Sequence, residues 1–204
     1  MMSRDSLSIW GGFTTMLGGA LWIVLRPLVL TTWGRTVFGF DYVDYNRMMV
    51  APLLLLLLGV VALLFLEPAS TGRLGRWGLA IVALGLATSL AGVIVEFWVA
   101  GGLRGNRAGA MLGWGLYGLG LLAQTIGLGL FGAGALRGRR LPTWLGFLVV
   151  VMAALPVLWF PMIAMRLDSL SILDQVLYGA GWMVLGYALG PRPSALPAAH
   201  RAYR

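Results

Sequence analysis

Three charged side chains lie inside long apolar runs of this sequence, where they could do chemistry. Arg26 follows the run LWIVL, Glu96 stands directly before Phe-Trp, and Asp174 follows Ser-Ile-Leu. A charged residue within a membrane-spanning helix costs about 3 kcal/mol on insertion scales, and such residues commonly mark ion or substrate pathways. A carboxylate beside a guanidinium could bind an ion or a polar molecule. We therefore take Glu96, Arg26 and Asp174 as candidate residues of a ligand or ion pocket.

Two of these three residues also have a purely structural explanation. Arg26 could extend its long side chain to the lipid headgroups. Asp174 follows Ser171 at the S/T-x-x-D/E spacing that caps helix starts, where an acid also suits the helix dipole. Glu96 is short and has apolar neighbours, so neither explanation applies to it. We predict that Glu96 faces the interior of the bundle and lies close to at least one of Arg26, Arg47, Arg104 or Asp174.

Further polar residues could complete such a pocket. The connection at residues 31–47, TTWGRTVFGFDYVDYNR, is rich in aromatics and carries Asp41 and Asp44. Aromatic residues collect at the membrane interface, so this connection is either an interfacial segment or a lid over an outward-facing pocket. Gln124 lies in the middle of another apolar run. It is expected either to form an interhelical hydrogen bond or to contact a pore or substrate.

Missing residue types exclude several chemistries. The chain has no cysteine, which excludes thiol catalysis and thiolate metal sites, and its fifteen basic residues are all arginine. A Schiff base needs a lysine amine. The one histidine, His200, lies near the C-terminus, so no apolar run offers the usual ligand of haem or zinc. We predict no catalytic residues, no metal and no cofactor, and we expect the protein not to be an enzyme.

The elements that must position these residues are six long apolar segments. Of the 204 residues, 59% are hydrophobic and only 11% are charged, which is typical of an integral membrane protein. We predict an all-α bundle of six transmembrane helices over residues 1–190, followed by a disordered cytoplasmic tail at 191–204. The expected spans are 9–30, 48–66, 77–100, 109–136, 143–165 and 172–190.

The fourth span, residues 109–136, is unusually rich in glycine. Gly113, Gly120, Gly127 and Gly134 recur every seven residues. In water each glycine would weaken a helix by about 1 kcal/mol relative to alanine, whereas in lipid bare stripes let neighbouring helices approach closely. We predict that these four glycines are helix-packing positions and that the glycine-rich fourth helix is central in the bundle.

Arginine placement predicts the orientation. With the N-terminus inside, nine arginines are cytoplasmic and five are outside, so both termini are expected in the cytoplasm of a multi-pass cell-membrane protein. The arginines fall in short loops, not in one basic stripe, which argues against a nucleic-acid partner. The expected partners are the lipid bilayer and either another membrane protein or a second copy of the chain.

Residues 134–146, GALRGRRLPTWLG, resemble a recurrent pattern in a family of uncharacterised bacterial multi-pass membrane proteins, grouped as a domain of unknown function. In that family a basic cluster is followed by Leu/Val-Pro-x-Trp and then by the fifth helix. The resemblance implies only the six-span architecture over most of the chain. The location that we expect is the bacterial inner membrane. That family has no established activity to carry over.

Three functions remain open at this stage. The first is a non-catalytic membrane protein that binds a small molecule in an outward-facing pocket or serves as an accessory subunit of a membrane complex. The second is a transport component, because size and span number look similar to substrate-binding subunits of energy-coupling-factor importers. Their A-x-x-x-A signature is missing from the first span, where Thr15 and Gly19 are a loose substitute. The third is an intramembrane enzyme acting on lipid, which lacks a nucleophile–base set.

Overall fold

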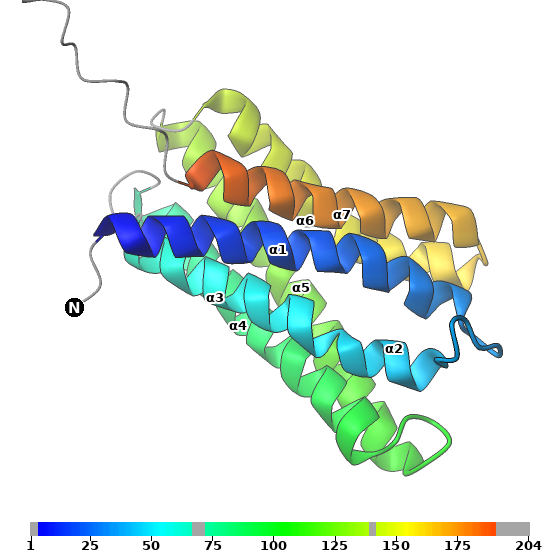
Figure 1. Ribbon diagram of the computed structural model, residues 1–204. Coiled ribbons are helices and arrows are strands. Elements are labelled where there is room, and N and C mark those ends of the chain that lie inside the picture. Colours follow the sequence, from blue (N-terminus) through cyan, green and yellow to red (C-terminus); the bar gives the residue numbers. More distant parts are fainter. Residues whose placement is uncertain (1–3, 67–71, 139–141, 191–204) are drawn as a thin grey trace, which may run out of the picture.

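The computed structural model describes residues 4–66, 72–138 and 142–190, which form helices joined by short loops (Figure 1). The tail predicted at 191–204 lies outside the described residues. The helices in chain order are α1 (Arg4–Thr31), α2 (Tyr42–Met48), α3 (Val50–Leu66), α4 (Gly72–Val93), the π-helix η1 (Ile94–Val99), α5 (Arg107–Gly138), α6 (Thr143–Ala164) and α7 (Asp168–Leu189).

Within the described residues, five helical segments are long and apolar enough to cross a membrane, which makes this an all-α, multi-pass membrane protein. They are Ser6–Thr31, Tyr42–Leu66, Gly72–Val99, Arg107–Gly138 and Thr143–Ala164. Each corresponds to an apolar run of the sequence, because a helix satisfies its own backbone hydrogen bonds in lipid. The remaining long helix, α7, has 22 residues but carries polar side chains in its first two turns.

The helices form a closed ring. Going around it, α1 packs on α3, α3 on α4, α4 on α5, α5 on α6, α6 on α7, and α7 returns to α1. The expectation that the glycine-rich helix is central is therefore wrong: α5 is one member of the ring, and its main helix contacts are with α4, η1 and α6. Large side chains fill the middle, among them Leu56, Leu86, Leu128 and Trp182.

Glycines bring α4 and α5 into backbone contact. A Cβ placed on Gly120 would lie 2.6 Å from the carbonyl oxygen of Gly85, and a Cβ on Gly85 would lie 2.7 Å from that of Gly120. The same reciprocal arrangement recurs one heptad away in each direction, at Gly78 with Gly127 and at Gly92 with Gly113. We call this contact the α4–α5 glycine seam. Gly134 is buried on the same helix.

A second seam joins the first and last helices. Gly12 faces the carbonyl oxygen of Gly186, and Gly19 faces that of Gly179, again with reciprocal contacts and a spacing of seven residues. The two helices of each seam are antiparallel, so each seam pairs early residues of one helix with late residues of the other. Close backbone approach without a bulky side chain is how membrane helices gain packing energy, since lipid provides no hydrophobic driving force between them.

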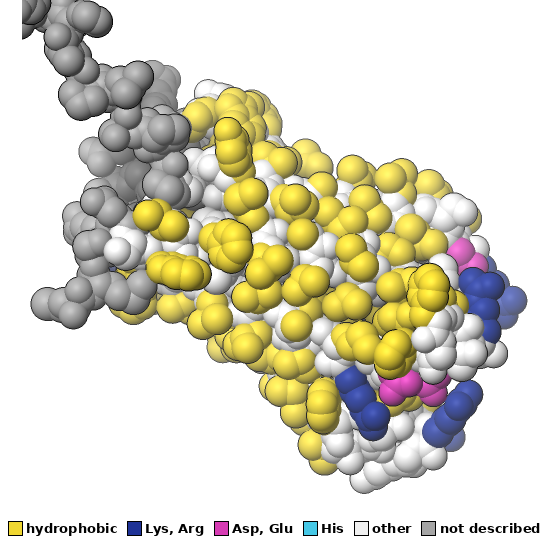
Figure 2. Space-filling view, in the orientation of Figure 1, with side chains coloured by type: hydrophobic (Ala, Val, Ile, Leu, Met, Phe, Trp, Pro, Cys, Tyr) yellow, Lys and Arg dark blue, Asp and Glu magenta, His cyan; other side chains and the backbone are white. Residues whose placement is uncertain are grey.

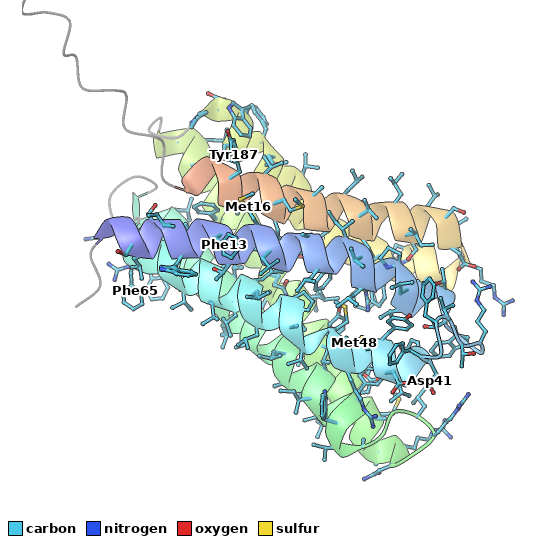
Figure 3. The ribbon with its side chains drawn as sticks, in the orientation of Figure 1. Phe13, Met16, Asp41, Met48, Phe65 and Tyr187 are labelled. Atoms are coloured by element: carbon cyan, nitrogen blue, oxygen red, sulfur yellow. The ribbon has the colours of Figure 1, made fainter. Side chains whose placement is uncertain are left out.

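One end of the bundle carries the connections 32–41, 100–106 and 165–167, and we call it the loop end; it is on the right in Figure 1. Figure 2 shows charged side chains gathered at this end and apolar side chains covering the visible flank. In Figure 3, Phe13, Phe65 and Tyr187 project from the flank, whereas Asp41 lies at the loop end. The three flank residues are more than half exposed, as expected of side chains that face lipid.

Candidate functional site

Arg26 lies inside the bundle, in a cage of aromatic rings. Its side chain is only 5% exposed. The guanidinium carbon lies 4.6 Å from the ring centroid of Trp159, 5.6 Å from that of Tyr117 and 6.0 Å from that of Trp22. These distances suit cation–π attraction, which is strongest where water is excluded. The explanation that Arg26 extends to the headgroups is therefore wrong.

An amide links Arg26 to Asp174. Arg26 Nε donates a hydrogen bond to Gln175 Oε1 at 3.2 Å, and Gln175 Nε2 donates to Asp174 Oδ2 at 2.8 Å. Asp174 is 3% exposed. The helix-capping explanation for Asp174 is also wrong, because α7 already begins at Asp168 and the backbone N–H of Ser171 bonds to the Leu167 carbonyl.

Glu96 lies in the π-helix η1. It is 6% exposed, and the charge of Arg26 acts on both Glu96 and Asp174 without an ion pair to either. The Glu96 carboxylate makes no hydrogen bond within the described part of the chain. Single turns of π-helix occur frequently at functional sites. Glu96 is thus buried inside the bundle, as its sequence context predicts, but within the described residues it forms no ion pair, so a close charged partner stays a prediction.

The glycine seam positions Glu96. Gly113, the seam residue nearest the loop end, would place a Cβ 2.5 Å from the backbone nitrogen of Glu96 and 2.6 Å from its Cβ. η1 ends at Val99, and the backbone carbonyl of Glu96 accepts a hydrogen bond from the N–H of Gly102 at 2.8 Å. Arg47 Nε donates to the carbonyl of Phe97 at 3.0 Å and so ties α2 to η1. Because Gly113 has no side chain, α5 leaves room for Glu96 to lie inside the bundle.

Several buried polar atoms around Arg26 have no hydrogen-bond partner among the described residues. They are Trp22 Nε1, Tyr117 Oη, Trp159 Nε1, Ser171 Oγ and Asp174 Oδ1. Buried polar atoms in native proteins are nearly always paired, and exceptions commonly indicate a water, an ion or a functional group. We call Arg26, Glu96, Asp174, Gln175 and Tyr117 the Arg26 cluster.

Gln124 joins a second buried network deeper in the bundle. It accepts a hydrogen bond from Tyr178 Oη at 2.7 Å and donates to Ser89 Oγ at 2.9 Å. Its Nε2 also reaches the Gly120 carbonyl at 3.3 Å. These contacts connect α4, α5 and α7, so Gln124 makes the interhelical hydrogen bonds that its position in an apolar helix favours.

The two acids of the first connection, Asp41 and Asp44, accept hydrogen bonds from backbone N–H groups. Asp41 Oδ1 accepts hydrogen bonds from the N–H groups of Val43 and Asp44 at 2.8 and 3.0 Å, while Asp44 Oδ2 accepts from the Asp41 N–H at 3.2 Å. This is a capping box at the start of α2. Asp44 also lies 3.8 Å from Arg47, a half-exposed ion pair. Neither acid belongs to the Arg26 cluster.

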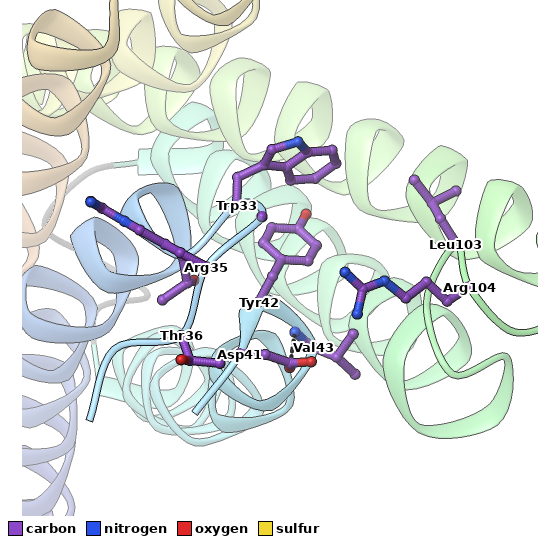
Figure 4. Close-up of a pocket in the computed structure, with 10 residues that line it drawn as sticks. Trp33, Arg35, Thr36, Asp41, Tyr42, Val43, Leu103 and Arg104 are labelled. Atoms are coloured by element: carbon purple, nitrogen blue, oxygen red, sulfur yellow. Dashed lines mark hydrogen bonds between the residues drawn. The ribbon is translucent and has the colours of Figure 1, made fainter. Parts of the chain in front are cut away.

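A cavity of about 530 Å³ opens at the loop end (Figure 4). Trp33 and Tyr42 pack edge to face, with ring centroids 4.7 Å apart. Arg104 extends toward Tyr42 across the cavity, whereas the Arg35 guanidinium points away from it. We call this the loop-end pocket. Its lining residues are Thr32, Trp33, Gly34, Arg35, Thr36, Asp41, Tyr42, Val43, Leu103 and Arg104.

Tyr42 connects the loop-end pocket to the Arg26 cluster. Its ring also contacts Phe97, with centroids 5.7 Å apart, and the charges of Arg26 and Glu96 both act on it. The predicted site residues thus fall into separate places: Arg26, Glu96 and Asp174 share one cluster, Asp41 lines the pocket and Gln124 lies deeper. Within the described residues, no group of three His, Cys, Asp or Glu side chains could hold a metal ion.

Sequence reasoning missed Gln175, Tyr117 and Trp159, which complete the surroundings of Arg26. Gln175 gave a usable signal, since an amide beside an acid is unusual in an apolar run. The aromatic residues gave none, because tyrosine and tryptophan are scattered through every span. Comparison of the chain with protein families, with characterised proteins and with solved structures finds no match.

Proposed function

We propose that this is a non-catalytic, multi-pass protein of the bacterial inner membrane that binds a small anionic molecule in the loop-end pocket. In this proposal α7 is a sixth span, both termini are cytoplasmic, and the loop end faces outward. The observation that carries the proposal is the cavity of about 530 Å³ with Arg104 extending into it. Pockets for small molecules commonly measure about 300–1,000 Å³.

The charge of the pocket favours an anion. Arg104 makes no hydrogen bond or ion pair with any described residue, so its guanidinium is free to bind a ligand. The acid of the pocket, Asp41, already accepts two backbone hydrogen bonds through Oδ1. A guanidinium group binds carboxylate and phosphate through paired hydrogen bonds.

The apolar part of the pocket favours a ligand with a planar or hydrocarbon portion. Trp33 and Tyr42 offer ring surfaces on one side, and Val43 and Leu103 offer aliphatic surface. An aromatic or short-chain carboxylate matches this combination better than a naked inorganic anion, because the rings would bury its apolar part while Arg104 binds its charge.

The test compares two probes, benzoate and inorganic phosphate, on the full chain in detergent by calorimetric titration. Benzoate is expected to bind, and Arg104→Gln is expected to weaken its affinity at least tenfold. Arg107→Gln is the matched control, because Arg107 is also exposed at the loop end but does not line the pocket. Equal loss of affinity in both variants, or no binding of either probe, would contradict the proposal.

The same chain could serve as an accessory subunit, a homo-oligomer or a component of an energy-coupling-factor importer, with the pocket as its substrate site. These alternatives differ in partner, not in the pocket chemistry. Co-purification with a pair of ATPases and a scaffold membrane subunit would favour the importer.

A further inference from the structure

We propose that the Arg26 cluster is a proton-binding site, in which a carboxylate of the pair Glu96 and Asp174 takes up a proton from the loop end. This proposal is independent of the anion proposed for the loop-end pocket, because the two sites use different residues. It concerns residues that are at most 7% exposed.

The charge balance of the cluster is the first argument. Arg26 carries one positive charge, and it acts on two buried acids, Glu96 and Asp174. One guanidinium can neutralise one carboxylate. The second carboxylate would remain an uncompensated ion in a water-poor interior, which is strongly unfavourable, so the cluster gains most from one added positive charge.

The unpartnered oxygens are the second argument. Asp174 Oδ2 accepts from Gln175, but Asp174 Oδ1 is buried without a partner among the described residues. Ser171, three residues earlier on the same helix face, has an unpartnered hydroxyl. A carboxyl group that gains a proton becomes a donor, and a serine hydroxyl can accept from it directly or through a water.

The chemical step balances without any other reactant. A hydronium ion at the loop end transfers its proton to a carboxylate oxygen. One O–H bond forms on the carboxyl group, one breaks in hydronium, and a water molecule is released. No group is oxidised or reduced.

The donor set favours a proton over a metal cation such as sodium. Oxygen-liganded cations need about six oxygens. Among the described residues, the oxygens without a hydrogen-bond partner are Asp174 Oδ1, Ser171 Oγ, Tyr117 Oη and the two of the Glu96 carboxylate, which are fewer than such a cation needs. The neighbouring polar atoms of Trp22 and Trp159 are N–H donors that cannot ligate a cation. A proton needs a single oxygen and an acceptor.

The charged, titratable and amide groups that interact with the two acids come from α1, α2, α5 and α7. Glu96 is faced by Arg26 from α1, Tyr42 from α2 and Tyr117 from α5. Asp174 is faced by Arg26 from α1, and on its own helix by Gln175 and Tyr178. Tyr42 also lines the loop-end pocket and packs on Phe97, the residue next to Glu96, so the proposal has the proton enter beside Tyr42.

The deeper network limits where a proton can go. From Tyr178 the hydrogen bonds run to Gln124 and then to Ser89, whose hydroxyl donates to the backbone carbonyl of Tyr117 at 3.5 Å. Within the described residues they therefore lead back to the cluster. Apolar side chains such as Leu86 and Leu128 fill the interior around it. The arrangement is therefore a site filled from one end, not a pathway across the bundle.

The primary test is difference infrared spectroscopy of the full chain in phospholipid nanodiscs as the pH is lowered. A carboxylic C=O band from a water-poor environment is expected, and either Glu96→Gln or Asp174→Asn should remove it. Asp168→Asn is the matched control, because Asp168 is exposed at the start of the same helix. A band that survives both substitutions, or the absence of such a band in the unsubstituted protein, would overturn the proposal.

A second measurement needs no variant and so does not depend on their folding. Dicyclohexylcarbodiimide reacts with protonated carboxyl groups in apolar surroundings, and mass spectrometry identifies the modified residue. Modification at Glu96 or Asp174, increasing as the pH falls, is the expected result, with the Asp41–Asp44 peptide as internal control. Modification confined to that control peptide would overturn the proposal. Protection by sodium at constant pH would also overturn it, in favour of a sodium site.

Discussion

Gly85 of α4 and Gly120 of α5 face each other so closely that neither could carry a side chain. A Cβ on either would lie 2.6–2.7 Å from the carbonyl oxygen of the other. Close to Gly120, Ser89 of α4 accepts a hydrogen bond from Gln124 of α5. The glycines therefore bring the two backbones together, and the polar side chains beside them fix the register of the two helices.

This contact predicts that Gly120→Leu will destabilise the bundle. Leucine would force α4 and α5 apart, and overpacking of this kind costs about 1–3 kcal/mol or more. Gly129→Leu is the control, because Gly129 lies on the same helix and nothing lies within 4 Å of its Cβ position. Thermal unfolding in detergent measures both. A similar loss of stability in both variants would show that helix propensity and not packing controls the result.

The helices could be predicted from the sequence, but which helices pack against each other could not. Apolar length determines a span, so each of the six expected segments corresponds to a helix. The heptad of Gly113 and Gly120 indicated close packing, yet a glycine stripe does not identify the helix that packs on it. The partner stripe, with Gly85 and Gly92, is visible only once α4 and α5 are seen to be antiparallel. The same limit led to the wrong prediction of a central helix.

Arg26 should be essential to stability while both acids are present. Arg26→Gln removes the cation whose charge acts on Glu96 and Asp174 and leaves two buried acids without compensation. Leaving a buried charge uncompensated in this way costs about 3–5 kcal/mol. The free energy of unfolding, measured in detergent at neutral pH, is expected to fall by this amount.

A second substitution tests whether charge is the cause. Adding Asp174→Asn to Arg26→Gln should recover part of the lost stability, because it removes one of the two acids. If the double variant is as unstable as the sum of the two single variants, Arg26 acts through its contacts with Trp159 and Tyr117 and not through its charge.

The Arg26 cluster was partly predictable, because the free-energy cost of a charge inside a membrane makes charged residues in apolar runs easy to recognise. A buried acid in a membrane needs a partner, and this reasoning predicted that Glu96 faces the interior with Arg26, Arg47, Arg104 or Asp174 close to it. The alternatives for Arg26 and Asp174 failed because each considered one helix alone. The contacts that decide between them come from α6 and α7, at Trp159 and Gln175, and no pattern within α1 indicates those residues.

The Gln124 network predicts a measurable coupling between two helices. Tyr178→Phe removes the hydroxyl that donates to Gln124 at 2.7 Å, and Gln124→Leu removes the acceptor. A double-mutant cycle should give a coupling energy of about 0.6–1.7 kcal/mol, the range found for interhelical hydrogen bonds in membranes. Tyr187→Phe is the control, since Tyr187 lies on the same helix and is 77% exposed. A coupling energy indistinguishable from zero would mean that the bond contributes no net stability.

The orientation of the bundle can be tested with a reporter that is active only in the cytoplasm. Nine arginines against five predict cytoplasmic termini, so a fusion after Arg204 should be active. An insertion at Asn106 should be inactive, because residues 100–106 belong to the loop end. The structure adds a constraint that arginine counting lacks: residues 32–41 lie at the same end, so an insertion between Phe38 and Gly39 must give the same result as one at Asn106. Activity at both loop-end sites would show that the orientation is the reverse of the proposed one. Activity at only one of these two sites would contradict the arrangement of the helices.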